Sequence, residues 1–201
     1  MKPDVRSGQE IRIGVAIRVP EPFATVLRTA RARVGDPAAD LIEPHITLLG
    51  PRVLPVPELP AVDAHLTAIT SRHQPFVVHL RGTASFRPVS PVVFVEVVEG
   101  IGSCELLEGE VRSGVLDHEL RFHYHPHVTI AHDVADAALD RAFDDLARFE
   151  ARFVVTDIHV YEHGDDGMWR TMGSYPLTGG AVAGEPAAAH PARNTGPTGA
   201  S

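Results

Sequence analysis

His45-Ile46-Thr47-Leu48-Leu49 is the stretch that decides the fold, because the chain carries a second version of it, His-Val-Thr-Ile-Ala, at residues 127–131. Each version follows a proline and alternates polar with apolar side chains. Successive side chains of a β-strand point to opposite faces, so each stretch read as a strand presents its histidine and threonine together. The aliphatic residues then face a core. The two stretches predict two walls of one polar cleft.

The periodicity of apolar residues around these stretches predicts a mixture of strands and helices. Each motif strand is preceded and followed by a helix, an order that fits an internal duplication. Hairpins and helices in this order favour an α+β fold with mostly antiparallel sheets. The expected strands are 11–19, 45–49 (ending at Gly50-Pro51), 76–81, 84–87, 92–98, 127–131, 152–161 and 169–177, and the expected helices are 23–34, 59–69, 101–111 and 136–146, the last capped by Asp136.

Length and composition describe an ordinary globular protein. The chain has 201 residues, 44% of them hydrophobic, which suffices for one domain or two small lobes that share a core. After residue 178 the composition changes to Gly, Ala, Pro and Thr with almost no bulky apolar residue. Such a segment buries too little surface to offset its ordering entropy. We therefore expect one ordered domain over 1–178 and a disordered tail over 179–201.

Charge and cysteine content exclude some classes of function. The net charge of −8 argues against a protein that grips long duplex nucleic acid, but a short oligonucleotide or a nucleotide can still bind in a local cleft. No apolar stretch is long enough to span a bilayer, and the N-terminus lacks the apolar segment of a signal peptide. Cys104 is the single cysteine, which suits a cytoplasmic protein. We expect a cytoplasmic monomer.

The repeated histidine and threonine suit acid–base chemistry at phosphorus. One imidazole can take a proton from the nucleophile while the other gives a proton to the leaving oxygen. Threonine hydroxyls two residues further along, on the same face, can donate to non-bridging phosphate oxygens. A single His-x-Thr is most often a plain strand edge, whereas two matched copies favour a site. This chemistry needs neither a metal nor another cofactor.

The two stretches, Pro-His-Ile-Thr-Leu-Leu-Gly and Pro-His-Val-Thr-Ile-Ala, resemble the paired signatures of the two-histidine (2H) phosphoesterase superfamily. Within it, the chain is most similar to the 2′-5′ RNA ligase and cyclic phosphodiesterase group. The opening strand at 13–20 and the closing segments at 160–163, 169–170 and 175–177 also resemble the ends of that family. The resemblance therefore covers about residues 10 to 178.

The resemblance implies a bilobal fold with pseudo-twofold symmetry, in which two mostly antiparallel sheets with flanking helices enclose a central cleft. It implies hydrolysis or transesterification of 2′,3′-cyclic phosphates or 2′-5′ phosphodiesters in a small nucleotide or short RNA, or the reverse ligation. His45 and His127 match the family's catalytic pair, and Thr47 and Thr129 match its phosphate-binding hydroxyls. His132 departs from the family, many of whose members have Arg after the second motif.

Two alternatives remain beside this interpretation. His123, His125 and His127 share a face if the segment is extended, and three imidazoles can bind zinc. Pro126 disturbs a regular strand there, so lining or orienting the cleft is the better expectation for His125. The chain can also be a nucleotide- or RNA-binding module without catalysis.

Overall fold

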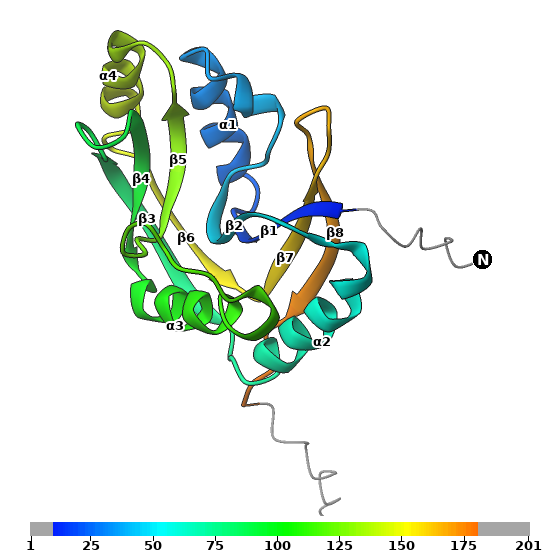
Figure 1. The fold of residues 1–201 in the computed structure, drawn as a ribbon. Helices are drawn as coiled ribbons and strands as arrows, with labels where there is room; N and C mark the ends of the chain where they lie inside the picture. Colours follow the sequence, from blue (N-terminus) through cyan, green and yellow to red (C-terminus); the bar gives the residue numbers. More distant parts are fainter. Residues whose placement is uncertain (1–9, 181–201) are drawn as a thin grey trace, which may run out of the picture.

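The computed structural model describes residues 10–180, which form two four-stranded antiparallel sheets with four α-helices (Figure 1). The strands are β1 (Glu10–Arg18), β2 (His45–Pro55), β3 (Phe76–Ser85), β4 (Val92–Glu99), β5 (His127–His132), β6 (Glu150–Val155), β7 (Asp157–His163) and β8 (Trp169–Pro176). The helices are α1 (Phe23–Arg33), α2 (Leu59–Thr70), α3 (Ile101–Val111) and α4 (Asp136–Asp145). The expected α+β class with antiparallel sheets is confirmed.

The two lobes are not successive halves of the chain. The first sheet has the order β2-β1-β7-β8 and so joins strands from both ends of the sequence, while the second sheet has the order β5-β4-β3-β6. The chain crosses between them at Thr156, because β6 pairs with β3 and β7 pairs with β1. The single strand expected over 152–161 was wrong: it is two strands that belong to different sheets.

The two sheets are related by a pseudo-twofold arrangement. Each motif strand, β2 or β5, lies at one edge of its sheet, and the two motif strands contact each other. Their pairing irregularities also match. Ala16 and Val15 of β1 face Thr47 and Leu49, while Phe94 and Val93 of β4 face Thr129 and Ala131. One extra residue, Leu48 or Ile130, is therefore inserted at the equivalent place in both motif strands.

The helices tie the lobes together. Helix α1 precedes β2 but contacts β5, and α3 precedes β5 but contacts β2. Figure 1 shows α1 and α4 toward one end of the molecule and α2 and α3 toward the other. Each motif strand therefore packs against the helix that precedes the other motif strand in the sequence. Neither lobe has a complete core by itself.

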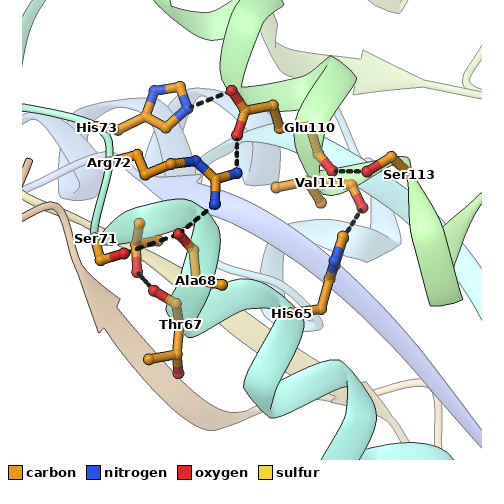
Figure 2. A network of polar contacts seen from close by, with 10 residues as sticks. His65, Thr67, Ala68, Ser71, Arg72, His73, Glu110, Val111 and Ser113 are labelled. Atoms are coloured by element: carbon orange, nitrogen blue, oxygen red, sulfur yellow. Dashed lines mark hydrogen bonds and ion pairs between the residues drawn. The ribbon is translucent and has the colours of Figure 1, made fainter.

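A polar network joins α2 to α3 at their shared end (Figure 2). Arg72 Nη2 lies 2.6 Å from the Glu110 carboxylate, which also lies 3.4 Å from His73 Nε2. His65 Nε2 lies 3.3 Å from the carbonyl oxygen of Val111. These partly exposed contacts fix the relative position of two helices whose buried sides face the core.

Three expected element boundaries were wrong. Strand β2 does not end at Gly50 but continues to Pro55 along β1. The strands expected at 76–81 and 84–87 form one strand, β3, whose pairing with β4 is irregular around Gly82, where φ is +71°. Asp136 is the first residue of α4, with Ala135 at the N-cap and no side-chain capping bond. Its carboxylate still lies where the helix dipole favours negative charge.

Within residues 10–180, no helix is long and apolar enough to cross a membrane. The described part of the chain ends in β8 and a short segment up to Gly180. The tail predicted over 179–201 lies, from residue 181 onward, outside the described residues.

Candidate active site

The two motif strands place their side chains as the alternation predicts. Ile46 and Leu48 of β2 are buried, at 0% and 2% exposure, and so are Val128 and Ile130 of β5. The histidine and threonine of each motif are only partly buried. Their shared face lies along the contact between the two sheets, since β2 and β5 adjoin. The structure therefore brings His45, Thr47, His127 and Thr129 to the same interlobe region.

Each motif histidine is oriented by a backbone carbonyl two residues earlier. His45 Nδ1 lies 2.8 Å from the carbonyl oxygen of Glu43, and His127 Nδ1 lies 2.7 Å from that of His125. A carbonyl oxygen only accepts hydrogen bonds, so both Nδ1 atoms carry the proton and donate it. In the neutral rings the lone pair is then on Nε2. Both imidazoles thus have the same tautomer and the same local support.

Burial shifts both imidazoles toward the neutral form. The pKa of His45 is lowered from 6.5 to about 4, chiefly by burial. The hydrogen bond to the Glu43 carbonyl raises that pKa, while the positive charges of Arg31 and His127 lower it. Burial also lowers the pKa of His127, as does the charge of His125, while the hydrogen bond to the His125 carbonyl raises it. Near neutral pH both Nε2 atoms are poised to accept a proton.

Two adjoining pockets flank the motif strands. A large one, of about 700 Å³, is lined by His127, Thr129 and Thr47 together with the loop before β5. A small one, of about 60 Å³, is lined by His45 and Thr47. Thr47, Leu49 and Gly50 line both pockets, so the two pockets meet along this part of β2. The cleft is therefore unequal: it is wide beside His127 and narrow beside His45.

Aromatic side chains form much of these walls, and sequence reasoning did not assign them to the site. The rings of Phe86 and Phe94 each lie 5.0 Å, centroid to centroid, from the His127 ring. Tyr161 and Trp169 line the small pocket with His45. The sequence favours a packing role for these last two residues, and they do pack in the sheet. No local pattern shows that β7 and β8 belong to the same sheet as β2, because that arrangement comes from the chain crossing at Thr156.

The polar loop expected at 117–124 proves to be a wall of the large pocket. It is attached to the opposite lobe by Tyr124, whose hydroxyl donates to the carbonyl oxygen of Thr47 at 3.0 Å. Leu120 and Phe122 of this loop are exposed large apolar residues, at 40% and 59% exposure. The loop thus gives the wide side of the cleft an apolar rim.

A buried carboxylate ties the lobes together at the end of the second motif strand. Asp36, 4% exposed, lies 2.7 Å from Arg31 Nε and accepts hydrogen bonds from the backbone N–H groups of Ala38 and His132. The side chain of His132 is partly exposed, lines the large pocket and lies 3.2 Å from the Asp133 carboxylate. His132, which directly follows the second motif, therefore lines the large pocket.

The zinc alternative finds no support in the donor geometry. Within the described part of the chain, no three His, Cys, Asp or Glu residues are grouped so that they could hold a metal ion. The rings of His125 and His127 stack at 6.4 Å between centroids. His125 instead lines the large pocket and orients His127 through its carbonyl, as the sequence favours.

Comparison with known proteins gives the family. Residues 19–167 match the 2′-5′ RNA ligase superfamily. The chain belongs to that family. This superfamily is also called the 2H phosphoesterases, and bacterial relatives of the chain are described as phosphoesterases. A "putative phosphoesterase" of Bacillus cytotoxicus is 34% identical over 102 residues, which span 51% of this chain and 59% of that protein. One of Halalkalibacterium halodurans is 27% identical over 169 residues, or 82% of this chain and 96% of that protein.

Several solved structures share the fold of this chain. The crystal structure of E. coli LigT complexed with 3′-AMP has a TM-score of 0.68 and 20% sequence identity, and the comparison covers 85% of this chain and 99% of that one. The complex of E. coli LigT with NADP+ gives a TM-score of 0.67 at 21% identity, with the same coverage. The expected bilobal fold, which is the fold of LigT, is thereby confirmed.

Proposed function

We propose that this 2H phosphoesterase cleaves 2′,3′-cyclic phosphate or 2′-5′ phosphodiester bonds in small nucleotides or short RNA-derived substrates, with His45 and His127 as general acid and base. One observation carries the proposal. Two imidazoles from separate strands have the same tautomer, held by matching carbonyl contacts, and each has a threonine beside it on the cleft face.

The four side chains suffice for the chemistry. One Nε2 takes the proton of the attacking hydroxyl or water, and the other, protonated, gives its proton to the leaving oxygen. Thr47 and Thr129 donate to the non-bridging oxygens, whose negative charge grows in the transition state. Because proton transfer and charge stabilisation both come from the protein, the reaction needs no metal ion. The reverse direction, joining a 2′-5′ bond, uses the same groups.

The pocket and the charge of the protein indicate the size of the substrate. A volume of about 700 Å³ with aromatic walls suits a nucleoside, whose base can pack against the apolar rim. The net charge of −8 disfavours a long duplex. LigT, which shares the fold, was solved with 3′-AMP and with NADP+. We therefore place small nucleotides and RNA ends first among the candidate substrates.

The test is a panel of 2′,3′-cyclic nucleotides and of 2′-5′ and 3′-5′ dinucleotides, assayed with EDTA present. The variants His45→Ala and His127→Ala should each lose at least about 10²-fold in turnover, the contribution typical of a positioned acid or base. His79→Ala is the matched control, because His79 lies on β3, away from both pockets, and pairs with Glu150 at 2.8 Å. Its turnover should equal that of the wild type.

Two results contradict the proposal. Unchanged turnover in both motif variants excludes the acid–base pair. A ligand that raises the melting temperature of the wild type without turnover of any substrate favours the alternative, a nucleotide-binding module, for which the large apolar pocket would suffice.

A further inference from the structure

Two buried polar atoms on β7 have no hydrogen-bond partner. Among side chains of residues 10–180, only Tyr161 Oη and His159 Nδ1 are buried without one. They are neighbours, with ring centroids 6.1 Å apart, and Tyr161 is only 5% exposed. Burying a hydroxyl without a partner is unfavourable, so such groups call for an explanation. Of the two residues, Tyr161 lines the small pocket beside His45.

The strand pairing places these two residues on the face of the sheet that carries the first motif. Residues opposite each other in an antiparallel pair share a face. Ala16 of β1 faces both Thr47 of β2 and His159 of β7, and Gly14 faces Tyr161. The row that begins at the catalytic-motif threonine thus continues through small residues of β1 to the two unpartnered groups.

The small side chains of β1 leave room for the small pocket beside His45, which is the narrow side of the cleft. A side chain at Gly14 would collide with Trp169, since a Cβ there would lie 2.8 Å from that ring. Trp169 therefore lies over Gly14, and with Tyr161 it lines the small pocket beside His45. The second lobe differs at the equivalent place, where Phe94 rather than Ala16 faces the motif threonine.

The volumes of the two pockets suggest different occupants. A pocket of about 60 Å³ is on the scale of a few water molecules rather than of a nucleoside. The pocket of about 700 Å³ on the other side of Thr47 has room for a nucleoside. A phosphate bound at Thr47 would therefore have its nucleoside on the His127 side and only a small group on the His45 side.

We propose that the narrow pocket holds the attacking water and that the Tyr161 hydroxyl positions this water for His45. The inference rests on the proposed function and assigns the roles within it. His45 Nε2 takes a proton from the water as its oxygen bonds to phosphorus. His127 gives a proton to the sugar oxygen as the bond between that oxygen and phosphorus breaks. The product is a nucleoside monophosphate, and exchange with solvent restores both imidazoles.

The variant Tyr161→Phe removes only the hydroxyl. We expect the hydrolysis of a 2′,3′-cyclic nucleotide to slow by about tenfold or more, the effect of losing one well-placed hydrogen bond in the transition state. The melting temperature should not fall, because the hydroxyl has no partner within the protein. Tyr175→Phe is the matched control: the Tyr175 hydroxyl lies 3.0 Å from Asp63, away from both pockets. That variant should melt about 2–4 °C lower with unchanged turnover.

A second substrate distinguishes between water and a sugar hydroxyl as the nucleophile in the small pocket. Cleavage of a 2′-5′ dinucleotide through a cyclic product uses the substrate's own 3′-hydroxyl as nucleophile, so Tyr161→Phe should leave that step unchanged. Equal slowing of both reactions would show that the pocket takes a sugar hydroxyl and would overturn the assignment to water. Unchanged hydrolysis, or a melting temperature lowered as far as in Tyr175→Phe, would also overturn it.

These outcomes differ from a failure of the proposed function, which would appear as a wild-type protein inactive on the whole panel. Binding still tests Tyr161 in that case. The water oxygen ends as a phosphate oxygen of the product, so 3′-AMP should bind the wild type more tightly than Tyr161→Phe in calorimetry. Equal affinities would contradict the inference whether or not the protein turns over substrate.

Discussion

The two motif histidines sit in environments that disfavour their charged forms. Burial lowers the pKa of His45 to about 4 and also lowers that of His127, and each feels the positive charge of a neighbour, Arg31 or His125. Catalysis needs one neutral and one protonated imidazole at the same time. The fraction of protein in that state is largest between the two lowered pKa values. Both lie below the ordinary value of 6.5.

We therefore predict a bell-shaped dependence of kcat/KM on pH with its maximum below pH 6.5, because kcat/KM reports the free enzyme. The measurement is kcat/KM for a 2′,3′-cyclic nucleotide from pH 3.5 to 9 at constant ionic strength. The lowered pKa values also make the stability of the protein depend on pH. A lowered folded-state pKa means that the unfolded chain binds protons first, so the free energy of unfolding should fall as the pH drops from about 6.5 toward about 4. A maximum above pH 7 would contradict the burial of the pair.

At the scale of elements, the sequence predicts the motif strands well and the walls of the cleft poorly. Period-2 alternation in β2 and β5 is a local property, so the faces of His45 and His127 follow from the sequence alone. The split at Thr156 has no strong local signal, because no Gly or Pro separates β6 from β7. The place of Tyr161 beside His45 depends on that split. The site residues outside the two motifs therefore cannot be predicted from the sequence, because non-local strand pairing determines where they lie.

The loop over 117–124 offers a test at this scale, because a single hydroxyl fastens it to the other lobe. Tyr124 donates to the Thr47 carbonyl, and burial raises the pKa of its phenol well above the usual range. Tyr124→Phe should cost about 0.5–1.5 kcal/mol of stability, the usual net value of such a bond. It should also raise KM more than it lowers kcat, since the loop lines the nucleoside pocket rather than the reacting atoms. Steady-state kinetics and urea unfolding measure both effects, and a fall in kcat alone would contradict this division.

At the scale of the whole molecule, the two lobes form one cooperative unit. Helices α1 and α3 each support the motif strand of the other lobe, and the chain passes between the sheets before it ends. Asp36 adds a polar link, since its buried carboxylate holds Arg31 of α1 and the backbone N–H of His132 at the end of β5. A catalytic pair divided between two lobes stays aligned only if the lobes do not move independently.

Asp36→Ala should therefore affect the whole molecule. The substitution leaves the Arg31 guanidinium, whose side chain is 8% exposed, without its counter-charge, and breaking a buried pair in this way typically costs about 3–5 kcal/mol. The matched control is Arg152→Ala, which breaks an exposed pair with Glu99 and should cost about 1 kcal/mol or less. Urea unfolding followed by far-ultraviolet circular dichroism and by the fluorescence of Trp169 measures both variants. Coincident transitions at a lower midpoint are expected, because the cores are continuous. Equal costs in the two variants would show that Asp36 does not join the lobes, and two separate transitions in the wild type would show that the lobes are not one cooperative unit.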